Sequence, residues 1–297
     1  TIYGGAVNAV LDPILIFGLD LELTGAALAS VAARLTIAGV SLLPIIKHYG
    51  GFVKPDTRDL MLDLRPVFAL AFPAILTQLA TPIGQAYVTR AMAEYGEAAV
   101  AGMAIVGRLT PIAFGVIFAL SGAVGPIIGQ NFGAGQHDRV RGGFKAGITF
   151  VGIFVVFMTI LLYFLRAPIA DLFTADGITR ELVYLFCGPL ALVFFFNGLL
   201  FVANASFNNL GHPYYSTWLN WGRHTIGTIP LVILGALWFG APGVLIGQAI
   251  GGVIFGTLSV VLAWRVMNKV ENEATRVPEP EPFAREARHL HQTSWKR

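Results

Sequence analysis

The chain has 297 residues, of which 55% are hydrophobic and only 12% charged, whereas a soluble domain carries about 25% charged residues. A chain of this composition cannot cover its own surface with polar groups, so a soluble globular fold is excluded and lipid is the expected solvent. The net charge of +3 is small and the basic residues gather in loops, which favours membrane orientation and excludes nucleic-acid binding.

Eight apolar runs alternate with short polar connections along the chain. A helix needs roughly 20 apolar residues to cross a bilayer core about 30 Å thick, and these runs are continuous, which predicts helices rather than the alternating strands of a β-barrel. We therefore predict an all-α, polytopic membrane helical bundle with about eight transmembrane helices. The predicted spans are 2–18, 24–46, 66–91, 99–127, 143–165, 182–206, 215–238 and 243–267.

The longest polar connection, 47–65, predicts a linker between two lobes. It separates the two helices of 1–46, the end of an N-terminal lobe, from the C-terminal lobe of 66–267. Lys and Arg concentrate in this linker and in alternate loops, which predicts that this side and the C-terminus are cytoplasmic. Residues 268–297 are rich in charge and proline, so we expect a disordered tail. Because Thr1 opens directly on an apolar stretch, we interpret the chain as a fragment entered partway through a helix.

Asp12 lies within the first predicted span, where a carboxylate costs roughly 2.5 to 3.5 kcal/mol and is a functional candidate by default. Asn8 precedes it by one helical turn on the same face, and Pro13 predicts a kink beside the acid. An antiparallel hairpin of the first two spans, centred near the middle of the loop, sets Ser30 level with Asp12. Carboxylate, amide and hydroxyl oxygens at one depth predict a site for a proton or a sodium ion. The alternative is a structural ion pair between Asp12 and Arg34.

Polar side chains also recur at helical spacing within the second lobe. They predict either the wall of a substrate cavity or ordinary interhelical hydrogen bonds, worth about 0.6 kcal/mol each. Arg223 lies inside the seventh span with cavity exposure as its expected environment, whereas the neighbouring His224 is expected to be a hydrogen-bonded core residue. The candidates for the cavity wall are Gln78, Thr81 and Gln85 on the third span, Asn197 and Asn204 on the sixth span, and Arg223.

A weak internal repeat relates the first and seventh spans. Asp12–Gly18 aligns with Ile229–Gly235, so that Pro230 stands where Pro13 does and predicts a second kink. Repeated helical units are typical of transporters in which two related bundles hold the substrate between them. The second copy keeps the proline without the acid, which favours a functional role for Asp12.

Nothing in the sequence favours catalysis. The glycine-rich segment Gly129–Gln136 lacks the Lys-Ser/Thr pair of a P-loop and predicts a turn. The single cysteine, Cys187, rules out a Cys/His metal site of the usual kind. Since no nucleophile-base pair or metal-ligand cluster is apparent, we predict that the protein is not an enzyme and has no cofactor.

Three motifs in this order resemble the multidrug and toxic compound extrusion (MATE) family. They are the run Asn8–Gly18 with its Asp-Pro pair, the run Gly25–Ser30, and the turn Gly129–Gly135. The resemblance implies twelve helices in two six-helix lobes, of which this chain matches the last eight. It also implies alternating access and export of cationic or amphipathic drugs or metabolites in exchange for protons or sodium.

The resemblance further implies roles for individual residues. Asn8, Asp12 and Ser30 match the cation site of the N-terminal lobe, and Thr81 and Asn197 stand where another branch carries acids. A DinF-like mechanism is therefore expected. The implied partners are a small organic cation and the bilayer, with the protein a monomer in the cell inner membrane. The alternative is a lipid-linked oligosaccharide flippase of the same superfamily, which would need a more basic cavity.

Overall fold

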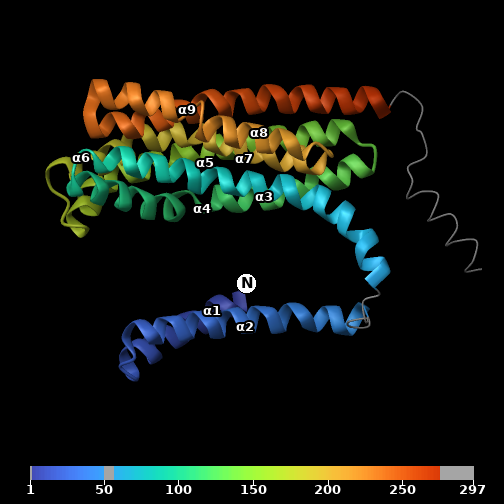
Figure 1. Ribbon diagram of the computed structural model, residues 1–297, viewed down its shortest axis with the longest axis horizontal. Coiled ribbons are helices and arrows are strands. Elements are labelled where there is room, and N and C mark those ends of the chain that lie inside the picture. The colour runs from blue at the N-terminus through green and yellow to red at the C-terminus, as the bar shows by residue number, and fades with distance from the viewer. Residues whose placement is uncertain (1, 50–56, 275–297) are drawn as a thin grey trace, which may run out of the picture. The chain divides into compact units, whose positions relative to one another are not determined.

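The computed structural model describes residues 2–49 and 57–274, and the backbone of these residues is helical apart from short turns (Figure 1). The chain divides into two compact units, Thr1–Arg65 and Pro66–Arg297, here called unit 1 and unit 2. Most of the predicted tail and the middle of the predicted linker lie outside the described residues.

Unit 1 contains a helical hairpin. Its first arm is α1 (Ile2–Pro13), continued by the π-helical turn η1 (Ile14–Gly18), and its second arm is α2 (Glu22–Tyr49). The bonding pattern changes directly after Pro13, where the Leu19 N–H donates to the Ile14 carbonyl at 2.9 Å. The arms approach closely because Gly25 has no side chain: a Cβ there would lie 2.7 Å from the Leu15 carbonyl.

The remaining helices extend beyond most of the predicted spans, because hydropathy reports only the hydrocarbon core and a helix continues through the polar headgroup layers. The α6, η2 and α7 segments form one crossing that bends at Gly188. The helices are α3 (Thr57–Ala93), α4 (Glu97–Gly133), α5 (His137–Leu172), α6 (Gly177–Leu185), the π-helical η2 (Phe186–Leu190), α7 (Ala191–Asn209), α8 (Pro213–His224) and α9 (Ile229–Ala274).

Helix α9 doubles back on itself at Gly240, whose backbone has φ 63° and ψ −140°. The two legs pack through bare backbone, since a Cβ on Gly243 would overlap the Gly235 carbonyl and one on Gly251 would overlap the Gly227 carbonyl. In the described residues 6 helical stretches are long and apolar enough to cross a membrane. The last of them, Pro213–Asn272, contains this reversal and so holds both final predicted spans, while Ile2–Gly18 is a shorter apolar helix.

Three local predictions differ from the structure. The segment predicted as a turn, Gly129–Gln136, is helical through Gly133, and only the following residues turn. The irregularity predicted at Pro230 is a break between two helices rather than a kink within one: residues 225–228 form turns, and Pro230 occupies the first turn of α9, where the missing N–H costs nothing. The first residues of the predicted tail continue α9 as far as Ala274.

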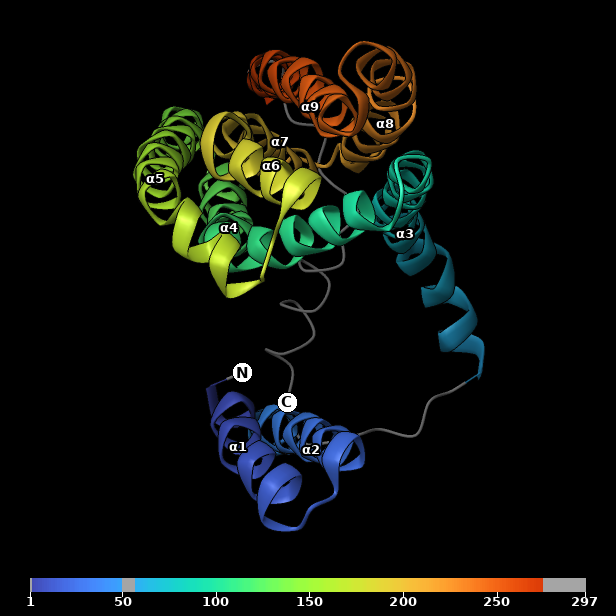
Figure 2. The ribbon, with the colours of Figure 1, turned by 90° about the vertical axis from the view of Figure 1, so that its left-hand side faces the viewer.

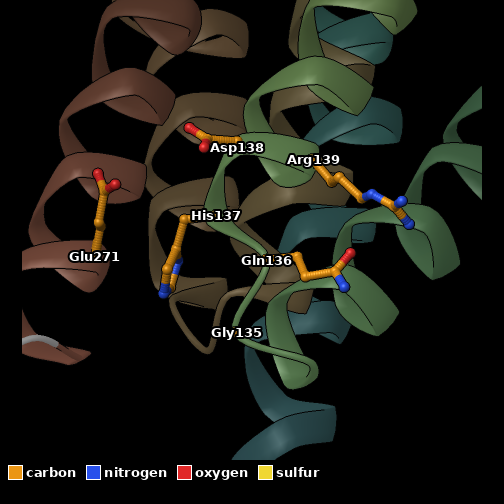
Figure 3. A pocket seen from close by; sticks show the side chains of 6 residues that line it. All are labelled: Gly135, Gln136, His137, Asp138, Arg139 and Glu271. Atoms are coloured by element: carbon orange, nitrogen blue, oxygen red, sulfur yellow. The ribbon is translucent and has the colours of Figure 1, made fainter.

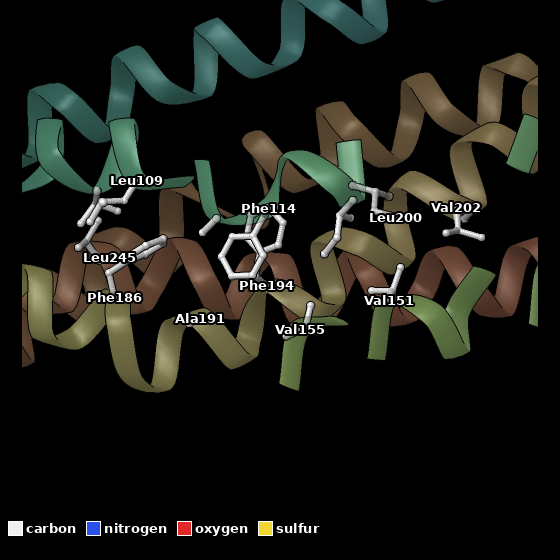
Figure 4. Close-up of a cluster of buried hydrophobic side chains, with 14 of the residues drawn as sticks. Leu109, Phe114, Val151, Val155, Phe186, Ala191, Phe194, Leu200, Val202 and Leu245 are labelled. Atoms are coloured by element: carbon white, nitrogen blue, oxygen red, sulfur yellow. The ribbon is translucent and has the colours of Figure 1, made fainter. Parts of the chain in front are cut away.

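The apolar core of unit 2 is built around α7, which packs against α4, α5, α8 and α9 (Figure 2). Phe114 of α4 stacks on Phe194 of α7 with ring centroids 4.1 Å apart (Figure 4). Gly198 of α7 lies against Val151 of α5, where a side chain would collide. Lipid supplies no hydrophobic drive between helices, so such close contacts supply the attraction.

Candidate functional site

The acid predicted to bind a cation lies in unit 1, half-buried on α1. The amide Nδ2 of Asn8 donates a hydrogen bond to Oδ1 of Asp12 at 3.3 Å. These residues are four apart in the sequence, so the α-helix itself brings them together. The π-helical turn that follows Pro13 places the pair directly before a change of helical type. The structure therefore joins a membrane carboxylate to an amide donor at an irregular point of the helix.

The alternative to a cation site, a structural ion pair between Asp12 and Arg34, is absent from the described part of unit 1. Arg34 is exposed on α2, and the ion pairs among the described residues of the chain join Arg141 to Glu271 and Arg180 to Asp171. Asp12 is thus not neutralised by Arg34 as a structural pair.

The structure shows no direct bond between Ser30 and Asp12 in the described hairpin, and their shared cation site stays a prediction. The predicted hairpin register would set Gly25 level with Phe17, whereas Gly25 lies against Leu15. Ser30 is exposed, and within the described hairpin no hydrogen bond joins it to the carboxylate. The register differs because close glycine contacts, rather than symmetry about the loop, decide which residues of the two arms face each other.

The candidates for a cavity wall in unit 2 fall into two groups. Gln78, Thr81 and Gln85 are exposed along α3, and Gln85 accepts a hydrogen bond from Gln248 of α9 at 3.3 Å. Asn197 and Asn204 of α7 are half-buried, and the amide oxygen of each is buried without a hydrogen-bond partner among the described residues. These two oxygens therefore do not make the ordinary interhelical hydrogen bonds of the alternative interpretation.

The last turn of α8 carries Arg223 and His224. The prediction that His224 is hydrogen-bonded is wrong: its side chain is 5% exposed, and neither ring nitrogen has a partner within the described chain. The ring packs against α3, since a Cβ on Gly84 would lie 2.7 Å from its Cγ. Arg223 and Asn197 both reach Gly252 of α9, where a Cβ would lie 4.0 Å from Arg223 Nε and 3.3 Å from Asn197 Oδ1.

Sequence reasoning predicted a kink at Pro230 but missed that the seventh span is fully broken between α8 and α9, where residues 225–228 form turns. Gly222 and Gly227 flank it, and the ring of Phe255 fills the space beside both. A pair of glycines five positions apart inside an apolar span was the available signal, because Gly weakens a helix by roughly 1 kcal/mol relative to Ala.

An open pocket lies at the ends of the helices rather than within the spans (Figure 3). It is lined by 135–139, at the turn from α4 into α5, and by Glu271 near the end of α9. Its charges are mixed, and Glu271 pairs with Arg141. Within the described ranges no cluster of three or more metal-ligating side chains occurs. This pocket offers neither a metal site nor a path through the bilayer.

Comparisons with known proteins connect this architecture to transport. A family model described as MatE matches residues 73–234. The chain is 29% identical over 274 residues to the FAD transporter of Shewanella oneidensis, covering 89% of this chain and 60% of that protein. It is 26% identical over 268 residues to the multidrug export protein MepA of Staphylococcus haemolyticus, covering 89% of this chain and 58% of that protein.

Among solved structures, the Vibrio cholerae MATE transporter VcmN in its bent form matches with a TM-score of 0.79 and 24% identity. The match covers 91% of this chain and 61% of VcmN, and it shows the fold alone. The chain spans about 60% of the length of the two curated relatives.

Proposed function

This chain belongs to the MatE family of multi-pass membrane transporters, and we propose that it acts in secondary-active antiport, exporting small amphipathic organic compounds in exchange for protons or sodium. Family membership makes the protein a transporter and not an enzyme. The observation that carries the coupling proposal is Asp12, a membrane carboxylate with an amide donor and no basic partner among the described residues.

The proposed mechanism uses the charge of Asp12. A proton or sodium ion on the carboxylate removes its net negative charge and weakens the hydrogen bond from Asn8, which is strongest to an ionised acceptor. Because that bond spans the last turn before Pro13, loading changes the bend of the arm. The two bends would correspond to high and low substrate affinity. A coupling ion can shift the equilibrium between these two states only by the difference in its own affinity for them.

The DinF-like branch follows from where the other acids lie. In the described part of unit 2 every Asp and Glu lies in a connection or within five residues of a helix end, and the positions that carry acids in another branch hold Thr81 and Asn197. Coupling is therefore proposed in unit 1. No observation in the described residues favours the oligosaccharide-flippase alternative.

The names of the relatives set the range of substrates. The Staphylococcus protein is a multidrug export protein, and the Shewanella protein is an FAD transporter. We propose that this protein carries amphipathic organic compounds of this size range. We also propose a monomer in the cell inner membrane with a cytoplasmic C-terminus, supported by the Lys and Arg distribution.

Asp12→Asn tests the coupling. In the protein reconstituted into vesicles, efflux of a fluorescent amphipathic compound under an imposed proton or sodium gradient should be lost, because an amide cannot change its charge. Asp20→Asn is the matched control, since Asp20 is exposed in the hairpin turn with φ 53°, a conformation that Asn tolerates. Undiminished gradient-driven efflux by Asp12→Asn would reject the coupling role.

A further inference from the structure

Unit 2 contains a polar cluster at mid-membrane depth that the coupling mechanism does not use. Arg223 lies near the end of the 12-residue helix α8, roughly 15 Å along the axis from Pro213 at about 1.5 Å per residue. That is about half of a hydrocarbon core 30 Å thick. Directly beyond it, residues 225–228 leave the helical conformation. Irregular backbone at this depth is tolerated only where protein buries it or where it lines a polar cavity.

The charge of Arg223 is not balanced within unit 2. The hydrogen bonds and ion pairs of the described residues do not include its guanidinium. The carboxylates of the same unit lie in connections or within five residues of a helix end over its described length. A charged side chain at this depth is costly to insert and normally has a partner of opposite charge. The described protein supplies none, so a bound anion would complete the site.

A second group with unused hydrogen-bonding capacity lies at the same place. The buried Asn197 oxygen faces the same glycine, Gly252, as the Arg223 guanidinium. An amide can present its NH₂ group in place of its oxygen after a flip. Helices α7 and α8 therefore supply two side chains that can donate hydrogen bonds, around a position where Gly252 of α9 has no side chain. The neighbouring His224 faces α3 instead, against Gly84.

We infer that Arg223 and Asn197 form a subsite for the anionic group of the transported compound, a carboxylate or a phosphate. The inference rests on the proposed transport function and names the substrate class, an amphipathic compound with a negatively charged group. A guanidinium suits this role because its planar fork can donate two parallel hydrogen bonds to one anion. The Asn197 amide beside it supplies a further donor that a phosphate accepts.

A purely structural role for Arg223 makes a different prediction. A cation in the last turn stabilises a helix through the partial negative charge at its C-terminus, and Arg223 is in the last turn of α8. That role would affect stability and would not distinguish an anionic ligand from a neutral one. The two roles therefore separate in a binding experiment with ligands that differ only in charge.

The experiment measures binding of three naphthalene probes to the protein in lipid nanodiscs by isothermal titration calorimetry. The probes are 1-naphthyl phosphate, neutral 1-naphthol and the cation 1-naphthylmethylammonium. The wild type should bind the phosphate most tightly. Arg223→Gln should lower phosphate affinity roughly ten-fold or more, the worth of a hydrogen bond to a charged group, and leave naphthol unchanged. Arg223→Lys keeps the positive charge but lacks the planar guanidinium, so its phosphate affinity should fall between those of the wild type and Arg223→Gln.

Arg108→Gln is the matched control, since Arg108 is also within a spanning helix but is exposed on α4, and it should keep the phosphate preference. Equal affinity of the wild type for all three probes would overturn the proposal. So would an Arg223→Gln variant that weakens all three alike or none. The Asp12→Asn variant separates the subsite from the coupling: it should keep the phosphate preference even where gradient-driven efflux is lost.

Discussion

At the scale of single residues, polar side chains in unit 2 tie helices together through backbone carbonyls. Trp221 of α8 donates from Nε1 to the Leu76 carbonyl of α3 at 2.9 Å, and Thr217 donates to the Pro73 carbonyl at 3.0 Å. Thr77 shares the same region, with its hydroxyl 3.0 Å from that of Thr217. These bonds hold α3 beside the turn of α8 that carries Arg223.

Trp221→Phe removes one of these bonds and should destabilise the protein by about 0.6 kcal/mol, and at most about 1.7 kcal/mol, the range measured for hydrogen bonds between membrane helices. Unfolding in mixed micelles measures it. Trp218→Phe is the control, because Trp218 is on the same helix but 75% exposed. Equal effects of the two substitutions would show that the hydrogen bond to Leu76 adds nothing.

At the scale of elements, glycine decides how closely two helical arms approach. The two legs of α9 touch through Gly235 and Gly243, and through Gly227 and Gly251. Gly240 makes the reversal possible because its positive φ is strained for any residue with a side chain. In unit 1, the lack of a side chain at Gly25 likewise lets its backbone lie against Leu15. Close approach of this kind is the main source of attraction between helices in lipid.

Gly243→Ala should destabilise the protein by about 1 to 3 kcal/mol, because the added methyl would overlap the Gly235 carbonyl and the legs would have to separate. Thermal unfolding in detergent measures the change. Gly115→Ala in α4 is the matched control: nothing lies within 4 Å of its added methyl, so the higher helix propensity of Ala should leave stability equal or slightly increased. A Gly243→Ala protein as stable as the control would contradict the packing argument.

At the scale of the whole molecule, charged side chains of unit 2 other than Arg108 and Arg223 gather near the two ends of its crossings. At one end Arg141 of α5 pairs with Glu271 of α9. At the other, Arg180 pairs with Asp171 at 2.7 Å, and the Arg166 guanidinium lies 4.1 Å from the Tyr163 ring centroid. The Arg141 end also carries Arg139 and Lys145, and this excess of basic residues predicts that it faces the cytoplasm.

Cysteine labelling tests this orientation. On a Cys187→Ala background, which removes the single native cysteine, Asp176→Cys should react with a membrane-impermeant maleimide in intact cells, because it lies at the turn opposite the basic end. Gln136→Cys, at the α4–α5 turn, should react only after the cells are opened. Labelling of Gln136→Cys in intact cells, with Asp176→Cys protected, would reverse the topology.

The sequence by itself determined the fold class, most of the spans and the candidate acid. Lipid imposes a local requirement, since each crossing needs its own run of apolar residues, and such runs can be counted without knowing the fold. The helical repeat likewise sufficed to place Asn8 beside Asp12, because that contact is made within one turn.

Only the tertiary structure decided which helices face one another. The contact of Gly25 with Leu15 sets the register of the hairpin, which differs from the register predicted from symmetry about the loop. Arg223 and Asn197 meet at Gly252 although they lie on separate helices, and His224 lacks the hydrogen bond expected of it. Such convergence depends on close packing of residues distant in the chain. Helical periodicity predicts which residues share a face of one helix, but not which other helix packs against that face.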